Sequence, residues 1–92
     1  MAQIIKTDGT IIDEVQPKNG TDFQLEELQA VVEGYIQIVR LDDDEVMVVN
    51  EEGKFQCEWN GAATTLAKMR RAIRPNDYIS GNVLVCNVKQ IK

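Results

Sequence analysis

The chain has 92 residues, of which 43% are hydrophobic, and a formal net charge of −5. A chain of this length buries only about two-thirds of its unfolded surface, so residues 1–92 are expected to form a single domain with one modest core. No apolar run approaches the roughly 20 residues that cross a bilayer, and the first residues lack the basic and then apolar pattern of a signal peptide. These features argue against a membrane protein and predict a cytoplasmic one.

The N-terminal segment predicts a β-hairpin. Gln3–Lys6 and Thr10–Val15 are rich in β-branched residues, and Thr7–Gly9 separates them. An Asp-Gly pair between two apolar runs is a strong hairpin signal, because both residues tolerate the backbone angles of a tight turn. Residues 17–20, which begin with proline and end with glycine, then break the sheet and lead the chain to a helix.

A first helix is expected from Thr21 to Gly34. Thr21 and Gln24 have the spacing of a capping box, in which each side chain covers a backbone N–H of the first turn. Gly34 is expected to end the helix in the left-handed conformation, which glycine adopts without a Cβ clash. The apolar stripe has helical spacing and consists of Leu25, Leu28, Val31 and Val32.

Beyond the helix, the apolar period changes to that of a strand. Tyr35–Leu41 is apolar on both sides, which predicts a central strand that is covered on both faces. Val46–Asn50 is expected to continue the hairpin. Lys54–Trp59 alternates, with its two aromatic residues and Cys57 on one face, and predicts the third strand of an antiparallel meander. We expect Trp59 to pack in the core rather than to stack on a base or anchor a partner.

The turn between the first two of these strands contains four consecutive acidic residues, Asp42, Asp43, Asp44 and Glu45. Four like charges repel one another, so stability alone does not favour them. Carboxylates also bind Ca²⁺ and Mg²⁺, but this run lacks the spacing and the glycine of a calcium loop. We therefore predict a solvated turn without a metal site, and consider it a candidate surface for a partner protein.

A second helix is expected to begin at a cap, Asn60, and to run to about Ala72. Its apolar stripe consists of Ala62, Ala63, Leu66, Met69 and Ile73, and its C-terminal end carries Lys68, Arg70, Arg71 and Arg74. Cations there suit the helix dipole, but four in seven residues exceed what capping requires. The cluster is therefore the candidate anion site, for a nucleotide phosphate, a nucleic-acid backbone or an acidic protein surface. On a regular helix the three arginines would lie close to one face and the lysine would be turned away.

Pro75–Asp77 ends this helix, and Val83–Val88 predicts a last strand in the sheet interior because both of its faces are apolar. Gly81 indicates a bulge or a close backbone approach. Cys57 and Cys86 are expected to be free, small apolar residues rather than a disulfide or a reactive thiol. The expected fold class is α+β, with a largely antiparallel sheet of about five to six strands and two helices in the order ββαβββαβ.

The charges are divided unevenly along the chain. Thirteen of the 15 acidic residues lie within residues 1–52, whereas seven of the 10 basic residues lie within residues 53–92. Halves of opposite sign can pair within one molecule, drive self-association, most simply as a dimer, or face two partners. They can also be ordinary solvated faces, and the sequence leaves these alternatives open.

No catalytic constellation is visible. The sequence contains no histidine, the side chain most often used for proton transfer near neutral pH. The single serine, Ser80, stands in no nucleophile motif, and neither cysteine has an evident activating base. We therefore expect a binding protein without catalytic residues, a metal or a cofactor.

Five motifs stand out: the run LEELQ, the pattern V-x-G-Y-I at residues 32–36, the pattern V-x-N-E-E-G-K at residues 48–54, NGAA at residues 60–63, and DYISGNVLV at residues 77–85. They resemble an uncharacterised family of small proteins found in bacteriophages, conjugative elements and gut bacteria, over about residues 22–88. Where that family commonly has a short link with a proline, this chain has KFQCEWNGAATTLAKMRRAI. The resemblance implies that the protein is encoded by a phage or mobile element, but it implies no particular chemistry.

Three binding functions are therefore expectations. In the first, a phage or mobile-element accessory protein binds and inhibits a protein of its bacterial host, with the acidic half imitating nucleic-acid phosphate or docking on a basic surface. In the second, a small anionic ligand such as a nucleotide signal is sequestered at the basic second helix. In the third, that helix binds nucleic acid, which the acidic N-terminal half disfavours.

Overall fold

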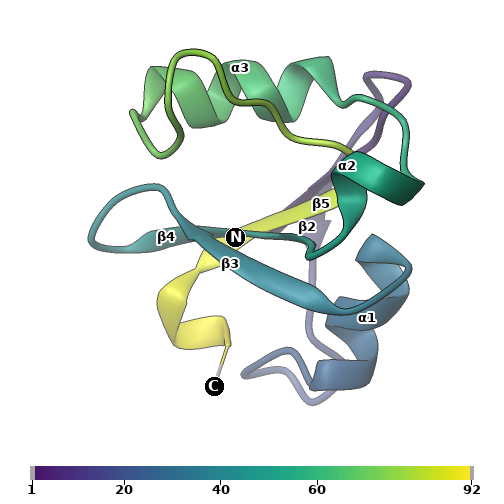
Figure 1. Ribbon diagram of the computed structural model, residues 1–92. Helices are drawn as coiled ribbons and strands as arrows, with labels where there is room; N and C mark the ends of the chain where they lie inside the picture. Colours follow the sequence, from purple (N-terminus) through teal and green to yellow (C-terminus); the bar gives the residue numbers. More distant parts are fainter. Residues whose placement is uncertain (1, 92) are drawn as a thin grey trace.

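The structure is a computed structural model that describes residues 2–91. The strands are β1 (Ala2–Ile5), β2 (Ile11–Val15), β3 (Ile36–Arg40), β4 (Glu45–Asn50) and β5 (Val83–Asn87), and the helices are α1 (Leu25–Val32), α2 (Gly53–Gln56), α3 (Gly61–Met69) and the 3₁₀ turn η1 (Val88–Gln90). The strands form one antiparallel sheet in the order β2-β1-β5-β4-β3. Helices α3 and α1 cover its opposite faces (Figure 1). The expected α+β class is confirmed.

The sheet separates two apolar cores. In β4, Met47 and Val49 belong to the core under α3, whereas Val46 and Val48 belong to the core over α1. Strand β5 divides its side chains in the same way, which confirms the predicted interior strand, although it ends at Asn87 rather than Val88. Two faces covered by helices explain why β4 and β5 are apolar without alternation.

The expectation that Tyr35–Leu41 forms a central strand is wrong. β3 pairs only with β4 and forms one edge of the sheet, where Tyr35 is 68% and Ile38 is 42% exposed. Its apolar pattern arises because Ile36 and Val39 pack against different cores. The place beside β4 is taken by β5, which comes from the other end of the chain.

Residues 54–59 do not form the predicted third strand of a meander. Residues 53–56 make the single turn α2, and only Trp59 keeps a strand-like bridge, to Ser80. Because β4 already has β3 and β5 on its two sides, no further strand can pair with it. Phe55 is 89% exposed and Trp59 is 63% exposed, so the predicted core position of Trp59 is also wrong.

Helix α1 begins later than expected. Its N-cap is Gln24 rather than Thr21, and the Glu27 carboxylate accepts a hydrogen bond from the Gln24 backbone N–H at 2.8 Å. The capping box is thus displaced by three residues. Of the expected apolar stripe, Leu28 is buried, whereas Leu25 is 54% exposed.

The end of α1 also differs from the prediction. Glu33, with a φ of 62°, takes the left-handed conformation that was expected at Gly34. Gly34 is required for a different reason, because a Cβ there would lie 2.7 Å from Nδ2 of Asn50. That amide donates a 3.0 Å hydrogen bond to the carbonyl of Val32 and so ties β4 to the helix end.

We expect Gly34→Ala to lower the free energy of unfolding by about 1–3 kcal/mol, because the new Cβ would displace Asn50 and leave a buried polar group unpaired. Denaturant unfolding provides the measurement. Glu33→Gly is the control, because it relieves a strained backbone and should leave stability unchanged or raised. If Glu33→Gly were the more harmful change, the left-handed residue would be wrongly placed.

Helix α3 begins at Asn60 as predicted, but it ends at Met69 instead of about Ala72. Arg70 is the C-cap residue, and Arg71 has a φ of 56°. Ala63 and Ala67 pack against the sheet, whereas Ala62 and Met69 of the expected stripe are exposed.

Both cysteines are free. Cys86 is fully buried in β5 among the apolar residues of the core on the α1 side, as expected for a small apolar residue. Burial raises the pKa of its thiol to about 11. Cys57 lies beyond α2 rather than on a strand. Gly81 N–H donates to the Glu58 carbonyl at 2.7 Å, so of the two predicted alternatives the structure has the close backbone approach. A Cβ on Gly81, where φ is 85°, would also lie 3.1 Å from Cys57 Sγ. Within residues 2–91, no helix is long and apolar enough to cross a membrane.

Candidate functional site

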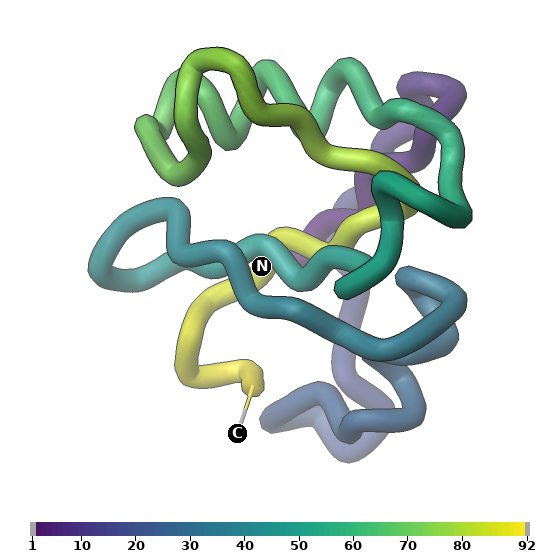
Figure 2. The backbone as a smooth tube through the Cα atoms, viewed as in Figure 1, coloured from purple at the N-terminus to yellow at the C-terminus, as the bar shows by residue number. Residues whose placement is uncertain are grey.

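A groove of about 710 Å³ lies between β3 and the segment 71–80. This segment returns from α3 toward β5 and passes over the β3–β4 hairpin (Figure 2). The floor of the groove is apolar and continues the core under α3; it is formed by Val39, Val49, Ala72, Ile73 and Ile79. Polar and aromatic side chains from α2 and from segment 71–80 stand around this floor.

The end of the groove near α2 holds an ion pair. Lys54 Nζ donates to the carboxylate of Asp77 and lies 4.9 Å from the centre of the Tyr78 ring. The hydrogen bond from Lys54 lowers the pKa of Asp77, and the backbone N–H of Tyr78 lowers it further. Phe55 completes this end with an exposed ring.

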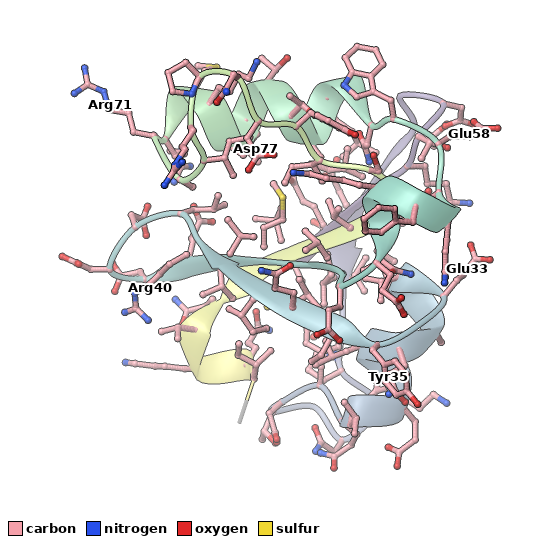
Figure 3. The ribbon with its side chains drawn as sticks, in the orientation of Figure 1. Glu33, Tyr35, Arg40, Glu58, Arg71 and Asp77 are labelled. Carbon is pink, nitrogen blue, oxygen red and sulfur yellow. The ribbon has the colours of Figure 1, made fainter. Side chains whose placement is uncertain are left out.

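The other end of the groove carries Arg71 and Arg74. Within residues 2–91, neither guanidinium forms an ion pair. Figure 3 shows Arg71 extending outward from the turn that follows α3. Arg40 also lines the groove, but its side chain lies on the side of the hairpin away from α3 (Figure 3). The groove therefore has aromatic rings at one end and, at the other, two arginines that form no ion pair, of which Arg74 still helps to lower the pKa of Asp77.

Arg70 connects the predicted basic cluster to the predicted acidic turn at residues 42–45. Its guanidinium contacts Asp42 Oδ2 at 2.7 Å and Glu45 Oε1 at 3.1 Å. The backbone N–H groups of Asp44 and Glu45 lower the pKa of Asp42, and Arg70 lowers it further. Part of the charge asymmetry is thus an intramolecular pairing, which was one of the alternatives left open.

The structure disperses the predicted basic cluster. Arg70, Arg71 and Arg74 do not share a helical face, because α3 ends at Met69 and Arg71 turns left-handed. Lys68 is exposed on α3 and does not line the groove. In the acidic turn, Asp43 and Asp44 remain exposed.

Sequence reasoning missed three residues of the groove: Lys54, Phe55 and Tyr78. The alternation of residues 54–59 assigned Phe55 to a sheet face, and no local pattern marked the other two. The groove brings together three segments that are far apart in the chain, so only their tertiary contact reveals it. Among residues 2–91, no group of three or more His, Cys, Asp or Glu side chains is placed to hold a metal ion.

Residues 3–91 match a family whose description is a domain of unknown function, DUF3846. The chain belongs to this family. The match spans the segment after Gly53, so the DUF3846 domain includes α2 and α3 as well as the motifs around them. No curated protein and no solved structure matches the chain. In this DUF3846 protein, the groove and the exposed side chains are the features that bear on function.

Proposed function

We propose that this DUF3846 protein is a non-catalytic binding protein whose groove takes a small ligand with an anionic group and a flat ring, such as a nucleotide. One observation carries the proposal: Arg71 and Arg74, which form no ion pair in the described part of the chain, line the same groove as the rings of Phe55 and Tyr78. Its volume of about 710 Å³ lies within the roughly 300–1,000 Å³ of small-molecule sites.

The residues of the groove suit the two parts of such a ligand. Guanidinium groups bind phosphate through paired N–H donors, which makes arginine well suited to phosphate recognition. An aromatic side chain can stack on the flat ring of the ligand, and the apolar floor of the groove shields that ligand ring from water. Binding without turnover would sequester the ligand, in the setting of a phage or mobile element that the sequence motifs imply.

Phosphate-bearing ligands should raise the melting temperature, because a ligand that prefers the folded state stabilises it by mass action. ATP, adenosine and inorganic phosphate serve as probes, since they separate the contribution of the ring from that of the phosphate. We expect the largest shift with ATP, and we expect it to fall with added salt. Arg71→Glu/Arg74→Glu should abolish the shift, and Phe55→Ala should reduce it for ATP but not for phosphate.

Lys68→Glu is the matched control, because it changes an exposed basic residue of α3 that lies outside the groove. Its ATP shift should match that of the wild type. If Lys68→Glu and a single Arg74→Glu variant lost the same part of the ATP-induced thermal shift, ATP binding would depend only on the net charge of the protein. That outcome would contradict the proposal. Arg70→Glu is a poor test, since it also breaks the contacts with Asp42 and Glu45.

A second candidate is the capture and inhibition of a host protein. It is favoured by the exposed aromatic side chains of Tyr35, Phe55 and Trp59, because such residues anchor protein interfaces. Asp43 and Asp44 could add an acidic contact to the same partner. This candidate would prevail if the phosphate-bearing probes gave no thermal shift and a host protein co-purified with the wild type but not with Trp59→Ala.

A further inference from the structure

The two edges of the sheet are built differently. At the β2 edge, the ladder with β1 shifts register between Ala2 and Ile4, and Glu14 adopts a φ of 57°. A register shift and a left-handed residue of this kind keep an edge strand from pairing with another chain. The β3 edge has neither, because β3 pairs with β4 without a shift from Ile36 to Arg40. Strand β3 is therefore the edge that remains open to another strand.

The backbone direction along β3 identifies the groups that face this open edge. Leu41 N–H donates to the Glu45 carbonyl at 3.0 Å, and Glu51 N–H donates to the Tyr35 carbonyl at 2.9 Å. Because hydrogen-bonded pairs alternate along an antiparallel ladder, odd-numbered residues of β3 bond to β4. The N–H and C=O groups of residues 36, 38 and 40 point away from the sheet. Within residues 2–91, β3 has no strand neighbour besides β4.

These outward groups are self-complementary. Suppose that β3 of a second copy runs antiparallel to the first, with Ile38 opposite Ile38. The outward backbone N–H and C=O groups of Ile36 in one copy then form hydrogen bonds with those of Arg40 in the other. A two-fold axis through Ile38 thereby satisfies every outward backbone group of both strands. The two Ile38 side chains, each 42% exposed, then form a cross-strand apolar pair on the same face.

The charges of β3 and of its approach match this arrangement. Arg40 lies at one end of β3, and Glu33 lies just before the other end (Figure 3). Within the described residues, neither side chain forms an ion pair. Antiparallel pairing brings Arg40 of each copy toward Glu33 of the other, twice per dimer. Within each copy, Arg70 already pairs with Asp42 and Glu45, so these two acids of the turn carry a counter-charge, whereas Asp43 and Asp44 stay exposed.

We infer that β3 is a self-association strand, on which a second copy of this chain pairs antiparallel around Ile38 and joins the two sheets into one. The axis runs perpendicular to the sheet, so the two grooves open on the same side of the joined sheet. This inference does not depend on the ligand proposed for the groove.

Sedimentation of the full chain at micromolar to millimolar concentrations tests the inference. We expect the wild type to form a dimer, and we expect Ile38→Lys and Ile38→Glu to raise the dissociation constant at least about tenfold, because like charges would meet at the axis. An equimolar mixture of these two variants should restore association, since opposite charges would then face each other. Ile11→Lys, at the half-exposed residue of the other edge, should leave the dimer intact.

Arg40→Glu provides a second test at an exposed position, in case an Ile38 variant does not fold. It should weaken the dimer by placing like charges near Glu33, and Glu33→Arg in the same chain should restore it. A wild type that stays monomeric at millimolar concentration would overturn the inference. Undiminished association of folded Ile38→Lys would do the same, as would a failure of the mixed variants to associate.

Discussion

Asn60→Ala should lower the free energy of unfolding by about 3 kcal/mol or more, because it removes a helix cap and leaves buried carbonyl groups unpaired. The Asn60 side chain is fully buried. Its Nδ2 donates to the carbonyls of Ile5 at 3.0 Å and Gly81 at 2.8 Å, and its Oδ1 accepts from Ala63 N–H at 3.0 Å. One side chain thus connects β1, the approach to β5 and the start of α3.

Denaturant unfolding measures this loss, with Asn76→Ala as the control. Asn76 is exposed in the turn after α3, so its replacement should stay within about 0.5 kcal/mol of the wild type. Asn60→Asp separates the two roles of the residue, since it keeps the capping oxygen but loses both donors to the carbonyls. If Asn60→Asp were as stable as the wild type, the bonds to Ile5 and Gly81 would contribute little, and the larger part of the expected effect would be wrong.

Leu28→Ala should cost about 2–5 kcal/mol of unfolding free energy, because it empties a buried site between α1 and the sheet. Leu28 is 4% exposed and belongs to the core on the α1 side, together with Phe23, Val32 and Val48. Helix α1 has only eight residues, and the side chains around Leu28 cannot close the space without moving the helix. A domain of this size has a small total stability, so such a loss can unfold much of the population.

Leu25→Ala is a matched control, since it makes the same substitution one turn earlier in the same helix. Leu25 is 54% exposed, and we expect its replacement to change stability by no more than about 0.5 kcal/mol. Thermal or denaturant unfolding of the two variants side by side gives the comparison. Similar losses in both variants would show that α1 is oriented differently on the sheet.

Apolar spacing placed Leu25 and Leu28 on the same stripe of a helix, but only Leu28 is buried. Periodicity predicted α1, α3, the N-terminal hairpin and the interior strand β5, because a helix or a strand repeats its apolar residues at a period that can be read directly. Short-range turn chemistry predicted the turn before β2 and the cap at Asn60. These features depend on residues close together in the chain.

Positions within the sheet could not be predicted in the same way. The pattern of Tyr35–Leu41 showed two apolar faces, but an edge strand between two cores has the same pattern as a central one. Residues 54–59 alternate like a strand, yet β5 occupies the place beside β4 that they would need. Whether residues 54–59 or β5 pairs with β4 depends on contacts between segments far apart in the chain. The spacing of apolar residues within one segment carries no information about such contacts.

The charged residues of the candidate site can be read directly from the sequence: a basic stretch at the end of α3, an acidic turn after β3, and no histidine anywhere in the chain. The tertiary structure decided which of these charges are used internally and which remain available. It paired Arg70 with Asp42 and Glu45, and it left Arg71 and Arg74 unpaired along a groove with Phe55 and Tyr78. The physical reason is that electrostatic and stacking contacts depend on distances of a few ångströms between side chains, and folding sets those distances between segments that are remote in sequence.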